Sequence, residues 1–187
     1  MRKLTTVLII ILAITFLNAA EESNHKKLSL TIGAGIRNVS QNTFETVYGT
    51  NNIAYSIDFA FTIKRSFEIF LHSDYLSAKG SLEFDPKDST LTIFPAELGV
   101  RIVLGKKLFT PYLGLGGGYY MFKEENFIGT VDESQIGFFG EGGFRFNFKG
   151  TFFIDLKLKY NILNYDMNGT DVDLGGLSYY GGIGIRF

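Results

Sequence analysis

Residues 152–162 read FFIDLKLKYNI, and their alternation determines how this part of the chain folds. The six even-numbered residues are all apolar or aromatic, whereas the residues between them include Asp155, Lys157 and Lys159. Strict alternation over this length is the signal of a β-strand with two chemically different faces, because side chains of a strand point to opposite sides in turn. The stretch therefore predicts a strand that is apolar on one side and charged on the other.

The same alternation recurs in seven further segments, and no segment after Glu21 keeps the 3.6-residue apolar period of a helix. Short connections between these segments alternate with long polar ones, which is typical of consecutive antiparallel hairpins. We expect strands at residues 27–37, 53–63, 66–77, 91–104, 108–122, 135–148, 152–162 and 175–187. We expect short turns at 64–65, 105–107 and 149–151, and long loops at 38–52, 78–90, 123–134 and 163–174.

One parity of these eight segments contains no charged residue, although 20% of the chain is charged. A lipocalin-like barrel in water has an apolar interior and a charged exterior, whereas a membrane barrel has the inverse arrangement. Eight strands enclose too little volume for the many Phe, Ile and Leu side chains of the apolar parity, so we expect that face to point outward into lipid. The sequence predicts an all-β fold, an eight-stranded antiparallel up-and-down transmembrane β-barrel.

The opposite parity carries the charges, and it would line the interior of the barrel. Six of these residues are acidic and six are basic, so they balance. Because an unpaired buried ion costs several kcal/mol, we expect them to pair and close the interior, with a gated or narrow pore as the alternative. The residues of this predicted lumenal charge network, with one histidine, are Arg37, Asp58, Glu68, His72, Asp74, Glu97, Arg101, Glu141, Arg145, Asp155, Lys157, Lys159 and Arg186.

Aromatic residues of the apolar parity gather near both ends of the strands. Paired rings on one strand lie about 20–25 Å apart at about 3.3 Å per residue and a tilt of about 40°, which is close to the apolar height of an outer membrane. We expect one ring of this aromatic girdle near the long loops, at Tyr55, Tyr75, Phe94, Tyr119, Phe138, Tyr160 and Tyr179. We expect the other ring near the short turns, at Phe67, Phe109, Phe148, Phe152 and Phe187.

The beginning of the chain has the layout of a secretory signal peptide. A basic start precedes an apolar run from Leu4 to Leu17, and small residues up to Ala20 precede two glutamates. That run is shorter than the roughly 20 residues that a membrane-spanning helix needs. We therefore expect a cleaved signal peptide at residues 1–20 and an outer-membrane β-barrel domain at residues 21–187.

Composition excludes several classes of function. The chain has no Cys, which rules out disulfides, thiolate metal sites and cysteine nucleophiles. Its formal net charge is −1, and removal of residues 1–20 takes away two basic residues and no acidic one, which leaves −3. With no basic stripe in addition, we expect no nucleic-acid partner.

Three segments make the chain resemble a known family. Residues 94–101 read FPAELGVR and residues 110–120 read TPYLGLGGGYY, and the last strand ends in YYGGIGIRF at Phe187. With these motifs the chain resembles bacterial outer-membrane proteins with the eight-stranded β-barrel domain of the OmpA/OmpX type. The resemblance implies the outer membrane of a Gram-negative-type bacterium, with the termini and short turns in the periplasm and the long loops outside. It also implies that the barrel-assembly machinery recognises the closing strand, and the residues of this assembly signal would be Tyr179, Ile183, Ile185 and Phe187.

Nothing in the sequence predicts a catalytic site, a cofactor or a metal. The string His72-Ser73-Asp74 suggests a hydrolase, but in a strand Ser73 points away from the face that carries the other two side chains. The oxygen-rich segment 166–173 lacks the glycine and the closing glutamate of an EF-hand loop, so we interpret it as an acidic loop.

We therefore expect a non-enzymatic outer-membrane β-barrel protein with a closed polar core, in contact with outer-membrane lipid. Its role would be envelope integrity or surface interaction, and its partner would be an extracellular protein or surface ligand at the loops. Apolar loop residues that would serve as contacts are Phe84, Phe127, Ile128 and Tyr165. The alternative is a narrow small-solute channel, followed by a lipid-modifying outer-membrane enzyme and, last, a soluble ligand-binding barrel.

Overall fold

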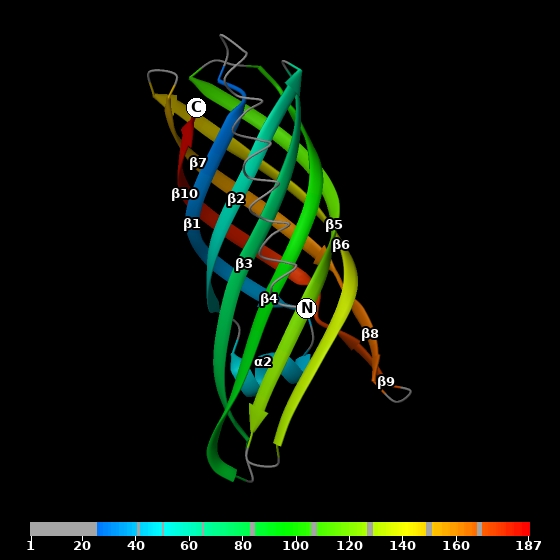
Figure 1. Ribbon diagram of the computed structural model, residues 1–187. Coiled ribbons are helices and arrows are strands. Elements are labelled where there is room, and N and C mark those ends of the chain that lie inside the picture. The colour runs from blue at the N-terminus through cyan, green and yellow to red at the C-terminus, as the bar shows by residue number, and fades with distance from the viewer. Residues whose placement is uncertain are drawn as a thin grey trace, which may run out of the picture.

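Eight antiparallel strands close into a barrel in the order β1-β10-β7-β6-β5-β4-β3-β2, which confirms the predicted fold class (Figure 1). The computed structural model describes residues 26–40, 42–49, 51–64, 66–82, 85–105, 108–126, 129–148, 151–167 and 170–187, so the predicted signal peptide lies outside the described residues. The barrel strands are β1 (Leu28–Val39), β2 (Asn52–Lys64), β3 (Phe67–Leu82), β4 (Asp85–Val103), β5 (Phe109–Asn126), β6 (Gly129–Phe148), β7 (Phe152–Ile162) and β10 (Gly176–Arg186).

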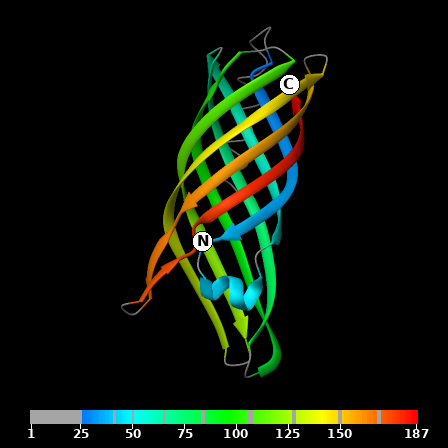
Figure 2. The same cartoon turned by 180° about the vertical axis from the view of Figure 1, so that it is seen from behind.

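The first and last strands close the barrel. They pair from Ser29 with Arg186 to Val39 with Gly176, and Leu28 and Phe187 exchange two backbone hydrogen bonds of 3.0 Å. The end of the barrel where Leu28 and Phe187 meet is called the turn end here, because β2–β3, β4–β5 and β6–β7 are joined there. The opposite end is called the loop end (Figure 2).

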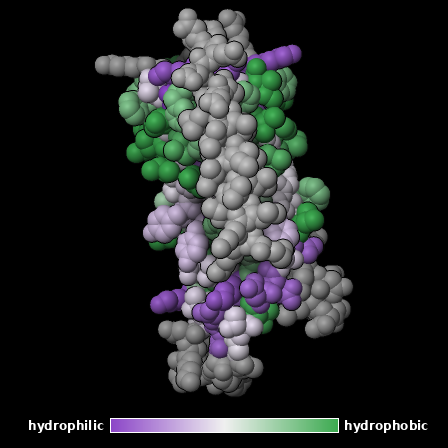
Figure 3. All heavy atoms as spheres, viewed as in Figure 1, coloured by the Kyte–Doolittle hydropathy of each residue, from purple (hydrophilic) through white to green (hydrophobic). Residues whose placement is uncertain are grey.

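The apolar parity faces outward and the charged parity faces the interior. Leu156 and Ile183 are 48% and 65% exposed, whereas Arg145 and Lys159 are 0% exposed. Hydrophobic side chains form a band on the visible outer face, and polar residues gather toward both ends (Figure 3). This inverted arrangement is stable only where lipid replaces water around the barrel wall.

Ser73 is the only serine or threonine on the predicted lipid-facing parity, and its hydroxyl forms a hydrogen bond within the barrel wall. Its hydroxyl donates a 2.6 Å hydrogen bond to the backbone carbonyl of Pro95 on the neighbouring strand. Proline has no N–H, so it cannot complete the ladder between β3 and β4 at this position. The bond satisfies a polar group that would otherwise face hydrocarbon.

Two of the predicted long loops are wrong, because four strands continue beyond the aromatic girdle. β3 and β4 stay paired as far as Leu82 with Asp85, and β5 and β6 stay paired as far as Asn126 with Gly129. Residues 78–90 and 123–134 are therefore mostly strand, and β3, β4, β5 and β6 form a sheet that protrudes from the loop end (Figure 2). We call these extensions the protruding sheet.

The other two predicted loops also contain regular structure. The first holds a short helix, α2 (Asn42–Tyr48), and the last holds a hairpin of β8 (Asn164–Met167) and β9 (Thr170–Asp173). A helix of this length is too short to give a recognisable 3.6-residue pattern, so the sequence did not indicate it. Among the described residues, no helix is long and apolar enough to cross a membrane.

The helix α2 packs against an apolar cluster at the loop end. Phe44 is 5% exposed and packs among apolar side chains that point inward from the barrel strands. We call this group the mouth cluster, and its buried members are Phe44, Ala54, Leu76, Ala78, Leu91, Ile93, Tyr120, Phe122, Leu163 and Tyr180. The interior therefore has two zones, with charged side chains toward the turn end and apolar ones at the loop end.

Close backbone contact holds α2 in place. A Cβ atom on Gly80 would collide with the backbone carbonyl of Val47, so only glycine at this point of β3 allows the helix to lie so near. The Tyr48 hydroxyl donates a 2.8 Å hydrogen bond to Glu124 and lies 2.8 Å from the Ser89 hydroxyl. Burial, with the nearby Glu124 carboxylate, raises the pKa of Tyr48 to about 12, so the phenol stays protonated at neutral pH.

Candidate functional site

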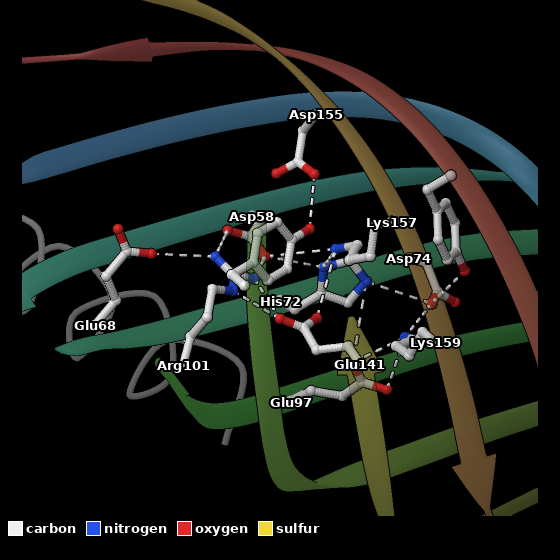
Figure 4. Close-up of polar contacts among 12 residues, drawn as sticks. Asp58, Glu68, His72, Asp74, Glu97, Arg101, Glu141, Asp155, Lys157 and Lys159 are labelled. Atoms are coloured by element: carbon white, nitrogen blue, oxygen red, sulfur yellow. Dashed lines mark hydrogen bonds and ion pairs between the residues drawn. The ribbon is translucent and has the colours of Figure 1, made fainter. Parts of the chain in front are cut away.

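All the predicted lumenal charges except that of Arg186 come together in one network, in which His72 links the ion pairs of the two halves (Figure 4). The predicted residues point inward from seven strands, while β5 contributes tyrosines and glycines. Twelve of the thirteen predicted residues are buried, and Arg186 is partly exposed at the turn end. The network can be followed from the turn end to the loop end in three steps.

Nearest the turn end, Arg145 joins two carboxylates. Its Nη1 atom lies 2.9 Å from Glu68 Oε1, and its Nε atom lies 3.3 Å from Asp155 Oδ2. Asp155 also accepts a 2.6 Å hydrogen bond from the Tyr112 hydroxyl. Tyr112 is itself 1% exposed, so this phenol is a buried part of the network that the charge pattern did not indicate.

In the middle of the barrel, Arg101 binds three carboxylates. Its Nη2 atom lies 2.6 Å from Glu141 Oε1 and 3.0 Å from Asp58 Oδ2, and its Nη1 atom lies 3.4 Å from Glu68 Oε2. The guanidinium carbon also lies 4.1 Å from the centre of the Phe70 ring. This one cation connects the turn-end step to the middle one, since Glu68 binds both Arg101 and Arg145.

Toward the loop end, Lys159 bridges two further carboxylates. Its Nζ atom lies 2.8 Å from Asp74 and 2.9 Å from Glu97. The phenol of Tyr180 donates a 2.9 Å hydrogen bond to Asp74, and that of Tyr120 donates a 2.7 Å bond to Glu97. Both tyrosines also belong to the mouth cluster, so they join the charged zone of the interior to the apolar one.

Arg37 forms the last ion pair before the loop end. Its Nη1 atom lies 3.4 Å from Asp74 Oδ1, and its Nη2 atom donates a 3.3 Å hydrogen bond to the backbone carbonyl of Leu174. Leu174 follows β9 and packs at the edge of the mouth cluster. Arg37 therefore connects the network to the chain that leads from the β8–β9 hairpin back into the barrel.

His72 lies between the middle step and the loop-end step. Its Nδ1 atom lies 3.1 Å from Lys157 Nζ and 3.5 Å from Asp58, and its Nε2 atom lies 3.6 Å from Asp74. The neighbouring Ser73 points to the outer face and bonds to Pro95, as described above. His72 and Ser73 therefore cannot act together as base and nucleophile, because their side chains lie on opposite sides of β3.

Glycines on β5 make room for this network. A Cβ on Gly118 would lie 2.7 Å from the Glu97 side chain, and one on Gly114 would lie 3.0 Å from that of Glu141. A side chain at either position would displace a carboxylate from its cation. Among the described residues, no group of three or more His, Asp or Glu side chains has the arrangement of a metal site.

Arg186 is the exception among the predicted cations. No ion pair joins it to a carboxylate of the described chain, and its guanidinium carbon lies 4.8 Å from the centre of the Phe153 ring. It therefore stacks on an aromatic side chain at the turn end rather than joining the network.

The residues predicted for the aromatic girdle all lie exposed on the outer wall. The loop-side ring includes Tyr55 and Tyr75, which are direct cross-strand neighbours, and the turn-side ring includes the neighbours Phe148 and Phe152. The four residues of the predicted assembly signal lie exposed on β10 and directly after it, where Tyr179, Ile183, Ile185 and Phe187 are 46%, 65%, 39% and 37% exposed. Of the predicted loop contacts, Phe84, Phe127 and Ile128 lie outside the described residues, as does the side chain of Tyr165.

The protruding sheet has two different edges. On one side, α2 packs against the inward face of β3 at Gly80. On the other side, β6 pairs with β7 only from Phe138 onward, whereas it pairs with β5 along its whole length from Gly129. We call residues Gly129–Ser134 the β6 edge, and no described strand pairs with its outer side.

Comparison with known proteins gives a consistent result. Residues 6–187 match the family described as the outer membrane protein β-barrel domain. No match is found among curated protein sequences.

Several solved structures are similar over most of the chain. The attachment invasion locus protein Ail of Yersinia pestis, solved with the heparin analogue sucrose octasulfate, is 17% identical, with 87% of this chain and 99% of Ail covered and a TM-score of 0.61. Neisserial surface protein A is 13% identical, with 86% and 97% covered and a TM-score of 0.67. OprG of Pseudomonas aeruginosa is 15% identical, with 87% and 97% covered and a TM-score of 0.62. At these identities the similarity supports the fold alone.

Proposed function

The chain belongs to the outer membrane protein β-barrel domain family, and from this premise we propose that it is a non-enzymatic barrel with a closed interior that acts through its loop end. Its role is surface interaction or envelope integrity. The observation that carries the proposal is the buried polar network of the interior. Ion pairs join Arg101 to Glu68, Asp58 and Glu141 on the turn side, and on the loop side they join Lys159 to Asp74 and Glu97, and Arg37 to Asp74. His72, which lies 3.5 Å from Asp58 and 3.6 Å from Asp74, links the two groups. Mobile ions would have to displace these paired charges to cross the barrel.

The placement in the membrane belongs to the same proposal. Residues 1–20 direct export and are cleaved, and the barrel-assembly machinery recognises the closing strand β10 through its outward-facing side chains. The band of apolar side chains between the two aromatic rings contacts outer-membrane lipid. The loop end faces outward, so that α2, the protruding sheet and the β8–β9 hairpin meet the surroundings of the cell.

The charge of the loop end argues against a sulfated sugar as its ligand. Ail was solved with a sulfated heparin analogue. Here the four segments 38–52, 78–90, 123–134 and 163–174 contain eleven acidic and three basic residues, a net charge of −8. This charge repels sulfated sugars and attracts cationic partners, so the ligand of Ail is not proposed for this chain.

Two measurements on the mature protein test the closed interior. Folded barrel that resists detergent should run at a different gel mobility before and after boiling. In a planar lipid bilayer the same preparation should give no conductance steps. Regular conductance steps from a heat-modifiable preparation would favour the alternative of a narrow channel with a charged lining.

A truncated variant tests the role of the loop end. Shortening the β3–β4 and β5–β6 hairpins at the level of the aromatic girdle removes the protruding sheet and leaves the membrane strands unchanged. We expect cells with this variant to keep a heat-modifiable barrel but to lose surface binding or resistance to detergent. If both properties equal those of cells with the intact protein, and differ from those of cells without it, the barrel wall rather than the loop end carries the function.

A further inference from the structure

The β6 edge is an open strand edge of the protruding sheet. At β3, the helix α2 lies over the extension, with the carbonyl of Val47 against Gly80. At β6, residues 129–133 are all exposed, and Val131 is 39% exposed. In an antiparallel ladder every second residue directs its N–H and C=O away from its partner, so the β6 edge presents backbone groups that another strand can bind.

The residues along the β6 edge carry negative charge. Asp132 and Glu133 lie on β6, and Glu124 and Glu125 of β5 lie opposite Val131 and Thr130. The single cation among them, Lys123, forms an ion pair with Glu125 and lies directly across from Asp132. These five residues have a net charge of −3, and the neighbouring Glu125 and Asp132 raise the pKa of Lys123, so it stays protonated.

This charge decides between two possible occupants. If two copies of the chain paired through their β6 edges, Asp132 and Glu133 of one copy would approach those of the other, and like charges across a ladder are destabilising. A cationic segment would instead place lysine or arginine against the same carboxylates. The edge thus discourages self-association and favours a basic strand.

We propose that the β6 edge binds an extended, cationic segment of a partner protein, which adds to the protruding sheet as a further strand. Main-chain hydrogen bonds along Gly129–Ser134 provide the binding energy, and Asp132 and Glu133 select for positive charge on both faces of the added strand. Val131 gives an apolar contact on the face that carries Glu133, because residues two apart in a strand share a face. This inference rests on the proposed function and names the class of partner for the loop end.

Synthetic peptides added to the mature protein in lipid nanodiscs test this inference. The probe is an acetylated and amidated peptide of alternating Thr and Lys, eight residues long, with a Thr–Glu peptide of equal length as its opposite. We expect the Thr–Lys peptide to bind, the Thr–Glu peptide not to bind, and amide hydrogen exchange to slow along Gly129–Ser134 in the complex. Slowed exchange elsewhere, without protection of the β6 edge, would overturn the proposal.

A matched pair of charge variants distinguishes binding at the β6 edge from attraction by the overall negative charge of the loop end. Asp132→Lys combined with Glu133→Lys should weaken binding by about tenfold or more, as charge reversal at a binding surface does. Asp166→Lys combined with Asp171→Lys changes the net charge equally on β8 and β9 and should change affinity by less than about threefold. Equal losses in the two double variants would mean that only bulk charge attracts the peptide.

A backbone variant tests strand addition itself. Two single variants, Val131→Pro and Asp132→Pro, each remove one backbone N–H. Because adjacent residues of a strand direct their N–H groups to opposite sides, one of the two variants loses an N–H that points away from β5, toward the added strand. That variant should lose binding of the Thr–Lys peptide while its heat-modifiable gel mobility is retained. If neither proline variant loses binding, the peptide does not add as a strand and the inference fails. The proposed function is tested separately, by the conductance and truncation experiments.

Discussion

Replacing Arg101 by methionine should destabilise the barrel far more than the same change at Arg186. Both arginines point inward, and methionine keeps much of the apolar volume of either side chain. Arg101 is 1% exposed and lies within 3.4 Å of Glu141, Asp58 and Glu68. Arg186 has no ion pair with a described carboxylate and rests on Phe153.

The expected size of the loss follows from what Arg101 leaves behind. Glu68 keeps Arg145 at 2.9 Å and Asp58 keeps Lys157 at 3.5 Å, but the nearest remaining cation to Glu141 is Lys157 at 3.9 Å. Breaking a buried ion pair by removing one partner costs about 3–5 kcal/mol, because the other charge stays buried without its partner. Losing an aromatic contact such as that of Arg186 costs about 0.5–1 kcal/mol.

Urea unfolding in phospholipid vesicles measures both losses. The chain has no tryptophan, so the folded fraction is best read from the gel mobility of unboiled samples. Adding Glu141→Gln to Arg101→Met removes the carboxylate that has only Lys157 left, at 3.9 Å, and should recover part of the free energy of unfolding. Equal destabilisation by Arg101→Met and Arg186→Met, or a loss below about 1 kcal/mol for Arg101→Met, would refute the view that ion pairs hold the interior together.

Three further outcomes are expected. Leu156→Arg puts a charge on the lipid-facing wall and should cost about 2–4 kcal/mol of unfolding free energy, whereas Asn168→Arg, between β8 and β9 in the sequence, should be tolerated; equal costs would contradict the face assignment. Gly80→Leu should displace α2 from β3 and expose it to limited proteolysis without loss of heat-modifiable mobility, and Phe44→Ala should do the same; unchanged resistance to protease in both would show that α2 is held by other contacts. His72→Ala should leave the acyl composition of the surrounding lipid unchanged, and a change in lipid turnover would speak for an enzyme.

The membrane part of the fold could be predicted because lipid imposes a single rule on every strand. Leu156 must face hydrocarbon, and its neighbours Asp155 and Lys157 must then face inward, so parity alone assigned the lumenal residues. Which charges pair could not be predicted. Lys159 meets Asp74 across the barrel from a distant part of the sequence, and such contacts depend on the stagger between strands, which no local pattern reveals.

The loop end was harder to predict because the rule changes there. Beyond the girdle the outer wall meets water, so outward positions such as Lys79 and Thr92 become polar while inward positions such as Ala78 and Phe122 become apolar. The period of two continues, but the chemical identity of the faces is reversed. A search for segments that are charge-free on one constant parity therefore ended the strands too early.

The position of Phe44 has a consequence for the order in which the protein assembles. Phe44 belongs to the mouth cluster, whose other members come largely from β2, β3, β4, β5 and β10, so the cluster is incomplete until the first and last strands have met. The helix α2 must therefore reach its final position after the barrel has closed. A spectroscopic label near Phe44 would accordingly time the final step of biogenesis, separately from the insertion that precedes it.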